Sequence, residues 1–157
     1  MEKKKKKKSI EIVNRRATHE YHFVNTYEAG IVLQGTEIKS IRSGFVNLSD
    51  AYCFFNKDGE LWVRSMYIKE YEFGTYFNHE TRRPRKLLLH KAELRKLEKR
   101  VKEKGFSIIP YRLYFSDRGI AKLEIALATG KKSYDKRESI KAKDQKRDLD
   151  RMKKMYR

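Results

Sequence analysis

The aromatic residues of this chain are concentrated between two strongly basic ends. Of its 157 residues 19 are aromatic, and 17 of these lie in residues 17–130. Residues 1–16 hold eight Lys and Arg against two Glu, and residues 131–157 hold twelve against five acidic residues. Segments with dense like charge and few apolar residues cannot bury enough surface to fold alone. The sequence therefore predicts one folded domain, residues 17–130, between a disordered basic arm at 1–16 and a basic tail at 131–157.

A formal net charge of +18 indicates a polyanionic partner. Nucleic acid is the leading class of partner, and an anionic membrane surface is the alternative. The sequence has no run of about 18 apolar residues that would predict a membrane span, and its basic N-terminus lacks the apolar stretch of a secretory signal. The single cysteine, Cys53, lies in an apolar stretch, so we expect a buried thiol and a reducing, cytoplasmic setting.

Two β-hairpins are predicted in the middle segment. Strands over 51–56 and 61–68 flank Asp58-Gly59, and this dipeptide is a strong signal for a tight hairpin turn. Strands over 107–115 and 120–128 flank a second turn that contains Gly119. These hairpins indicate an antiparallel sheet.

Further strands and one helix complete the predicted domain. Partial alternation of apolar and polar residues favours a strand at 21–27 and, less regularly, at 36–42. A helix is predicted over 91–104, where Leu94, Leu97 and Val101 form an apolar stripe. Six or seven short strands with a polar exterior are typical of a small barrel. The predicted fold is therefore mainly β, an OB-like antiparallel β-barrel with peripheral helices.

An aromatic cluster within residues 67–77 has two interpretations. Exposed rings can stack on unpaired bases, whereas aromatic residues interrupted by a glycine more commonly cover the end of a barrel. The second interpretation is favoured, and the first stays open. The aromatic residues are Tyr67, Tyr71, Phe73, Tyr76 and Phe77.

Patterns for catalysis or metal binding are sparse. The four histidines do not pair with a second ligand at zinc-site spacing, and no glycine-rich phosphate loop precedes a helix. Carboxylates such as Glu20, Glu28 and Glu37 have the pattern of ordinary surface residues. The sequence predicts no catalytic residue, no metal site and no cofactor, with a metal-dependent nuclease as the enzymatic alternative.

The segment 130–137 is richer in binding chemistry. Lys and Arg neutralise phosphates, and Tyr134 offers a face on which a base can stack. A solvated run of charge ahead of a tail helix is an equally good interpretation of this segment. The rest of the tail has good helix propensity, but its apolar stripe buries too little to hold it against the barrel. We expect the tail to be mostly unstructured alone and helical on an anionic surface.

Short motifs in a fixed order run from Asn14 to about Lys141. They include Asn14-Arg15-Arg16-Ala17, Tyr27-Glu28-Ala29-Gly30-Ile31, Glu37-Ile38-Lys39-Ser40, Arg85-Lys86-Leu87-Leu88-Leu89-His90, and Gly130-Lys131-Lys132 with Asp135-Lys136-Arg137. Together they resemble the SmpB family, the SsrA-binding proteins that are the partners of transfer-messenger RNA in bacterial ribosome rescue.

The resemblance implies a function as well as an OB-like fold with a basic C-terminal tail. Members bind the tRNA-like domain of transfer-messenger RNA in place of the missing anticodon arm. The complex, which also holds the elongation factor that delivers aminoacyl-tRNA, enters the empty A site of a stalled ribosome, and the tail reaches into the vacant mRNA channel. Trans-translation then tags the nascent chain and releases the ribosome. A cytoplasmic monomer without membrane contact, cofactor or catalytic step is expected.

The resemblance also assigns two sets of site residues. His90 stands where many members have Asn, and an imidazole can likewise donate one hydrogen bond and accept another. A general binder of single-stranded nucleic acid is the alternative to this assignment as a whole. The residues expected to bind transfer-messenger RNA are Glu28, Leu88, His90, Lys131 and Lys132. Those expected at the ribosomal decoding centre and channel are Gly130, Tyr134, Asp135, Lys136, Arg137, Lys153 and Lys154.

Overall fold

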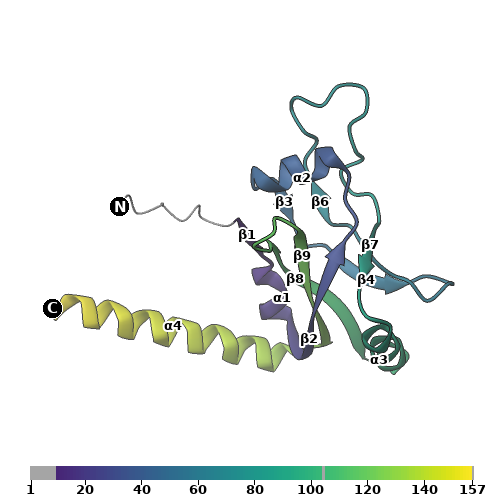
Figure 1. Ribbon diagram of the computed structural model, residues 1–157. Helices are drawn as coiled ribbons and strands as arrows, with labels where there is room; N and C mark the ends of the chain where they lie inside the picture. Colours follow the sequence, from purple (N-terminus) through teal and green to yellow (C-terminus); the bar gives the residue numbers. More distant parts are fainter. Residues whose placement is uncertain (1–9, 104, 157) are drawn as a thin grey trace.

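Antiparallel pairing closes six strands into a barrel (Figure 1). The computed structural model describes residues 10–103 and 105–156. Along the chain its elements are β1 (Glu11–Val13), α1 (Arg15–Glu20), β2 (Tyr21–Ile31), α2 (Gly35–Arg42), β3 (Val46–Asn47), β4 (Tyr52–Phe55), β5 (Leu61–Arg64), β6 (Tyr67–Ile68), β7 (Arg85–Leu88), α3 (Lys91–Val101), β8 (Phe106–Phe115), β9 (Ala121–Gly130) and α4 (Ser133–Met155).

Strand order confirms the predicted antiparallel barrel. Strands β8, β4, β5, β7, β2 and β9 are hydrogen-bonded in this order, and a further pairing of β8 with β9 closes the ring. The seam between β4 and β8 is narrow, since Cys53 and Ile108 form its one register pair among the described residues. Strand β1 extends the sheet beside β8, and β3 pairs with β6 in a separate small sheet.

Both predicted hairpins are present. In the first, Phe55 pairs with Leu61, and the Asn56 carboxamide oxygen accepts hydrogen bonds from the backbone N–H groups of Asp58 and Glu60 at 3.1 and 2.9 Å. Gly59 has a φ of 75°, which a glycine adopts without strain. In the second, β8 pairs with β9 along nearly its whole length.

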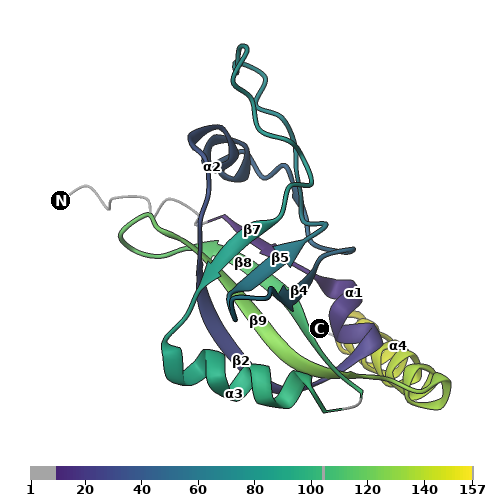
Figure 2. The ribbon, with the colours of Figure 1, turned by 90° about the vertical axis from the view of Figure 1, so that its right-hand side faces the viewer.

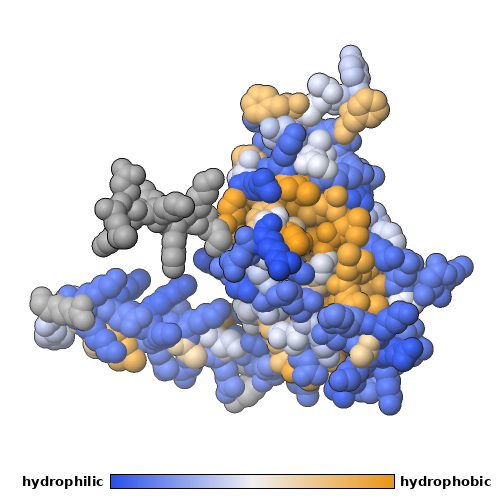
Figure 3. All heavy atoms as spheres, viewed as in Figure 1, coloured by the Kyte–Doolittle hydropathy of each residue, from blue (hydrophilic) through white to orange (hydrophobic). Residues whose placement is uncertain are grey.

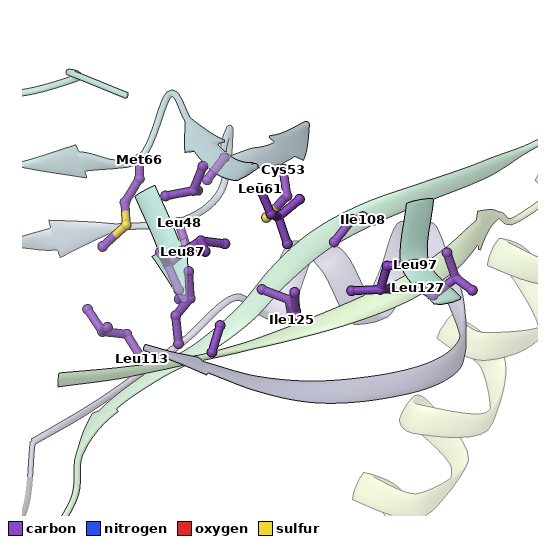
Figure 4. Packing of buried hydrophobic residues seen from close by; sticks show 14 of the residues in the cluster. Leu48, Cys53, Leu61, Met66, Leu87, Leu97, Ile108, Leu113, Ile125 and Leu127 are labelled. Atoms are coloured by element: carbon purple, nitrogen blue, oxygen red, sulfur yellow. The ribbon is translucent and has the colours of Figure 1, made fainter. Parts of the chain in front are cut away.

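The core fills the barrel with aliphatic side chains from most of its strands (Figure 4). Leu97 of α3 and Ile41 of α2 belong to the same buried cluster, so both helices pack on the barrel. Fully burying one such side chain stabilises the fold by roughly 1.5–3 kcal/mol. Cys53 is buried in this cluster as predicted, and burial raises the pKa of its thiol.

The strand predicted over 36–42 is wrong, because these residues form helix α2. Its buried residues, Glu37, Ser40 and Ile41, are spaced three and four apart and lie on one helical face. The helix begins with a capping box, in which the Gln34 backbone N–H donates to Glu37 Oε2 at 2.8 Å. Helical periodicity and this cap therefore outweigh the imperfect alternation in the sequence.

The predicted disordered arm of residues 1–16 also extends too far. Strand β1 pairs with β8, and α1 begins at Arg15. The buried Asn14 side chain fixes this entry by donating to the Leu48 and Pro110 carbonyls, each at 3.0 Å. The predicted disorder of the Lys3–Lys8 run lies outside the described residues.

The tail is a single helix, α4, that leaves the barrel and projects away from it (Figures 1 and 2). Its apolar residues Leu149, Met152 and Met155 are exposed, in keeping with the thin stripe in the sequence. That the tail is unstructured without a partner stays a prediction. Within the part of the chain that the structure describes, no helix has the length and apolar character to cross a bilayer.

Candidate nucleic-acid interface

A shallow depression of about 440 Å³ lies on the outside of the barrel, where β2, β7 and β9 meet the start of α3. Figure 3 shows hydrophobic side chains gathered on this side of the barrel among hydrophilic ones. Glu28 and Lys122 supply charge at the depression, while Leu88 and His90 supply an apolar group and an imidazole. The structure thus brings together three residues predicted to bind RNA, namely Glu28, Leu88 and His90.

Strand alternation positions Glu28. Its neighbour Ala29 points into the core with no exposed surface, so Glu28 faces outward. The Tyr114 hydroxyl on β8 donates a hydrogen bond to the Glu28 carboxylate, and Lys122 Nζ lies 3.8 Å from it. The Glu28 side chain is still about half exposed. The carboxylate is therefore held in place yet remains available as an acceptor for a ligand.

Tyr114 is a residue that the sequence reasoning missed. Burial, followed by the contact with Glu28, raises the pKa of Tyr114 to about 12, so the phenol stays a donor at neutral pH. Period-two alternation along 107–115 places Tyr114 on the same face as Arg112, but this pattern does not identify the partner of Tyr114. Only the barrel register, which pairs Tyr114 with Lys122, brings that face to Glu28.

A network of charges continues from Glu28 along the outer face of β8 and β9. The Arg112 guanidinium forms a bidentate pair with the Glu124 carboxylate, with Nε at 2.9 Å from Oε2, and its Nη1 donates to Glu11 Oε1 at 3.1 Å. These contacts raise the pKa of Arg112, chiefly through the hydrogen bond to Glu124. The network ties β1 to the barrel next to the depression.

Leu88 is exposed on β7 beside Gly30 of β2. Gly30 pairs with Leu88 between β2 and β7, and a Cβ on Gly30 would lie 3.4 Å from the Leu88 Cβ. The Leu88 side chain is 53% exposed beside this pair. His90 follows β7 and is the N-cap of α3, where its backbone N–H donates to Glu93 Oε2 at 3.4 Å. The helix cap thus fixes the backbone that carries the imidazole.

Lys131 and Lys132 lie at the opposite end of β9. Gly130 lies eight positions after Lys122 on this strand, which corresponds to about 26 Å along the strand. Lys131 Nζ donates to the Thr18 carbonyl and to Ser139 Oγ, both at 3.1 Å, and its backbone N–H donates to the Glu20 carbonyl. Lys131 therefore joins the barrel, α1 and the tail, and only three of the five predicted RNA-binding residues form one cluster.

The residues within 130–137 that are expected at the decoding centre lie at the joint where Lys131 connects the barrel and α1 to α4. Gly130 ends β9, and Asp135 lies in the first turn of α4, where a negative charge is favourable. Asp135 Oδ2 lies 3.5 Å from His22 Nε2 on β2. Arg137 is exposed and Lys136 is partly exposed. The side chain of Tyr134 lies outside the described residues, while its backbone is part of α4.

Lys153 and Lys154 are in the last turn of α4, far along the chain from this joint. Cations are favourable at a helix C-terminus, and both side chains are exposed. The predicted ribosome set is thus spread along the whole helix. In residues 10–103 and 105–156, no group of three or more His, Cys, Asp or Glu side chains is placed to hold a metal ion.

The comparison with family models decides the family. The model described as SmpB protein matches residues 11–155. The chain belongs to the SmpB family. The SsrA-binding protein of Phocaeicola vulgatus is 59% identical over 91% of this chain and 95% of its own length, and that of Bacteroides thetaiotaomicron is 56% identical over 94% and 97%. The SsrA-binding protein of Flavobacterium johnsoniae is 54% identical over 95% and 98%.

A solved structure described as "tmRNA-SmpB: a journey to the center of the bacterial ribosome" has the same fold. It aligns with a TM-score of 0.67 at 49% identity and covers 79% of this chain and 86% of its own. The mainly β architecture with peripheral helices, expected from the resemblance to the SmpB family, is confirmed.

This SmpB family member also has a buried charged cluster that the sequence reasoning missed. Glu37, expected at the surface, is fully buried with Arg85, whose Nε donates to Glu37 Oε1 at 2.9 Å. Arg83 donates to both oxygens of the same carboxylate at 2.7 and 2.8 Å. Burial opposes ionisation of Glu37, but the bonds from Arg83 and the Gln34 backbone and the charge of Arg85 lower its pKa. The cluster locks α2 to the start of β7.

Proposed function

We propose that this chain binds the tRNA-like domain of transfer-messenger RNA and delivers it, with the elongation factor that carries aminoacyl-tRNA, to the A site of stalled ribosomes. There α4 occupies the empty mRNA channel, and trans-translation tags the nascent chain and rescues the ribosome. Membership of the SmpB family and the likeness to the tmRNA-SmpB structure support this role.

One observation of the structure carries the proposal. The Glu28 depression and the base of α4 lie at opposite ends of β9, separated by about 26 Å along the extended strand. One RNA can therefore occupy the barrel while the basic helix contacts a second. The barrel supplies contacts of defined shape, and the tail supplies charge-driven, salt-dependent affinity.

Two sets of residues divide this work. Glu28, Leu88 and His90 contact the tRNA-like RNA, with Glu28 accepting hydrogen bonds from base amino or ribose hydroxyl groups. Residues from Asp135 to Arg137 act at the decoding centre, and Lys153 and Lys154 contact phosphates in the channel. Lys131 and Lys132 lie where the barrel meets α4, and there they contact the tRNA-like RNA or the ribosomal RNA. The protein works in the cytoplasm, as a monomer, and positions RNA without catalysing a covalent step.

Binding to a folded RNA tests the proposal. The full chain and a variant that ends at Gly130 are titrated with a tRNA-like RNA domain and with a single-stranded RNA of equal length at matched salt. We expect a preference for the folded RNA that survives truncation. Equal binding to both RNAs that collapses on truncation would instead indicate a general, charge-driven binder of single strands. Intact RNA after incubation with magnesium checks the nuclease alternative.

A further inference from the structure

The segment between β6 and β7 projects from the barrel and ends in exposed aromatic rings. Phe73, Tyr76 and Phe77 are 80%, 99% and 89% exposed. Figures 1 and 2 both place this projection at the end of the molecule away from α4, and Figure 3 shows hydrophobic side chains on it. The predicted covering of the barrel end is therefore wrong for these three residues. We call residues 70–80 the aromatic tip.

The aromatic tip is braced by its own hydrogen bonds. Asn78 spans it, since its Nδ2 donates to the Tyr71 carbonyl at 2.8 Å and its Oδ1 accepts from the Tyr71 N–H at 3.2 Å. A Cβ at Gly74 would lie 2.6 Å from Asn78 Nδ2 and 3.0 Å from the Tyr71 carbonyl oxygen, so a side chain there would disturb this brace. The Tyr71 and Phe73 rings meet edge to face, with centroids 5.6 Å apart.

The base of the projection is buried and anchored to α2. His79 is 3% exposed, and its Nε2 donates to the Ile68 carbonyl at 3.0 Å while its Nδ1 accepts from Thr36 Oγ1 at 2.9 Å. Arg85 donates to the Met66 and Thr81 carbonyls beside it. A braced loop on an anchored base holds its rings in water, where they cost solvation energy unless a partner covers them.

Charge selects the class of that partner. The aromatic tip contains three glutamates, Glu70, Glu72 and Glu80, and no Lys or Arg, in a chain with a net charge of +18. All three glutamates are exposed. Glu72 lies 3.9 Å from the Nζ of the flanking Lys69, and Lys39 Nζ lies 5.2 Å from the centre of the Tyr71 ring. Glu70 and Glu80 form no ion pair within the described part of the chain. These two carboxylates repel phosphates, so the base-stacking interpretation of the cluster is disfavoured. Guanidinium and ammonium groups, in contrast, pair with carboxylates and stack over aromatic faces.

Cation–π contacts of this kind are already present in this protein next to the aromatic tip. Lys69 Nζ lies 4.6 Å from the centre of the Phe45 ring, and the Arg82 guanidinium lies 5.6 Å from that of Tyr67. We propose that the aromatic tip binds an Arg- and Lys-rich segment of a ribosomal protein while α4 occupies the mRNA channel. This inference rests on the proposed function, because it places the chain on the ribosome.

Two double variants test the inference by the sign of their effects. Binding is measured between purified stalled ribosomes with an empty A site and the protein in complex with aminoacylated transfer-messenger RNA and its elongation factor. We expect Tyr76→Ser with Phe77→Ser, and separately Glu70→Lys with Glu72→Lys, each to weaken ribosome binding by about fivefold or more. Asp58→Lys, on the exposed turn between β4 and β5, is the matched control and should not weaken it. Affinity for the isolated tRNA-like RNA should not fall in any variant.

Cross-linking identifies the class of partner directly. A Phe77→p-benzoylphenylalanine variant, irradiated on the ribosome, should form a product that maps to a basic segment of a ribosomal protein. A product with RNA, or tighter binding by the Glu70→Lys and Glu72→Lys variant, would overturn the inference in favour of base stacking. A product with a second copy of this chain in the absence of ribosomes would also overturn it.

The two proposals fail in distinguishable ways. If the unmodified complex does not bind the stalled ribosome, the proposed function fails. If it binds and all variants bind equally well, with no protein cross-link at position 77, only the inference about the aromatic tip fails. Circular dichroism of each variant checks that the barrel is folded.

Discussion

The phenol of Tyr114 donates a hydrogen bond to the carboxylate of Glu28, across 86 residues of sequence. The contact joins β8 to β2 over the intervening β9, on the outside of the barrel. A carboxylate restrained in this way loses little rotamer freedom when an RNA donor approaches it. Tyr114 therefore restrains the Glu28 carboxylate, and under the proposed function it is a positioning residue for the RNA contact of Glu28.

Glu28→Ala should weaken binding to the tRNA-like RNA about tenfold, the loss of one hydrogen bond to a charged acceptor. A gel-shift or fluorescence titration at fixed salt measures it. Asp58→Ala removes the same charge from an exposed turn and is the control. Equal weakening by both variants would mean that the net charge, and not the Glu28 contact, changes the affinity.

Tyr114→Phe should weaken the same binding by a smaller factor, about threefold, because it frees the Glu28 side chain without removing it. Combined with Glu28→Ala it should add nothing further, and a double-mutant cycle measures this coupling. Additive losses would show that Tyr114 acts independently of Glu28.

The phenol of Tyr114 also links stability to pH. Because its pKa is raised from 10.0 to about 12, its contribution to stability is complete below pH 10 and is lost as the pH rises toward 12.

Replacing Asp135, Lys136 and Arg137 together by alanine should leave affinity for the tRNA-like RNA nearly unchanged and abolish tagging of stalled chains. Asp135 lies next to His22 at the base of α4, away from the Glu28 depression. In vitro translation of an mRNA without a stop codon measures tagging of the stalled chain. The titration described for Glu28→Ala measures RNA binding. A parallel loss of both activities would contradict the division of labour.

Glu37→Gln should destabilise the fold by about 3–5 kcal/mol, because it leaves the fully buried Arg85 without its counter-charge. Denaturant unfolding monitored by tryptophan fluorescence measures the loss. Since the pKa of Glu37 is lowered in the folded state, its contribution is present above the unfolded pKa of about 4.3 and is lost as the pH falls through the folded value. If the free energy of unfolding of the Glu37→Gln variant fell with decreasing pH as steeply as that of the unmodified protein, this linkage would be ruled out.

The free tail should exchange its amide hydrogens rapidly beyond about residue 140, and its helicity should rise on binding RNA. Exposed Leu149 and Met152 offer little apolar surface to hold α4 against the barrel. Hydrogen exchange with and without ribosomes measures this order, residue by residue. Slow exchange throughout α4 in the free protein would contradict the expectation.

The sequence predicted those parts of the fold that local pattern controls. Asp58-Gly59 fixes its hairpin through turn geometry alone, and Leu97 is placed in the core by helical spacing. Residues 36–42 were misassigned because Glu37 was taken for a surface residue, and its place on the buried face of the helix depends on Arg83 and Arg85, which lie more than 40 residues away. Local spacing is compatible with the helix, but only this long-range pairing accounts for a buried carboxylate.

The sequence predicted some residues of the candidate site and missed others. Glu28, Leu88 and His90 were assigned by resemblance to the SmpB family, and the barrel register brings them together. Tyr114 could not be assigned, since its contact depends on the register of three strands. The exposure of Phe77 was also missed, because aromatic composition does not distinguish a core residue from one presented to solvent.

The joint at Lys131 gives α4 the mechanics of a lever. The helix spans 23 residues, or about 35 Å, so a tilt of about 10° at its base displaces its far end by about 6 Å. A small rearrangement of Lys131 against Thr18 and Ser139 would thereby be amplified into a movement as wide as a nucleotide. Under the proposed function, once α4 is helical on the ribosome, such a tilt would move its C-terminal end within the channel while the barrel stays on its RNA.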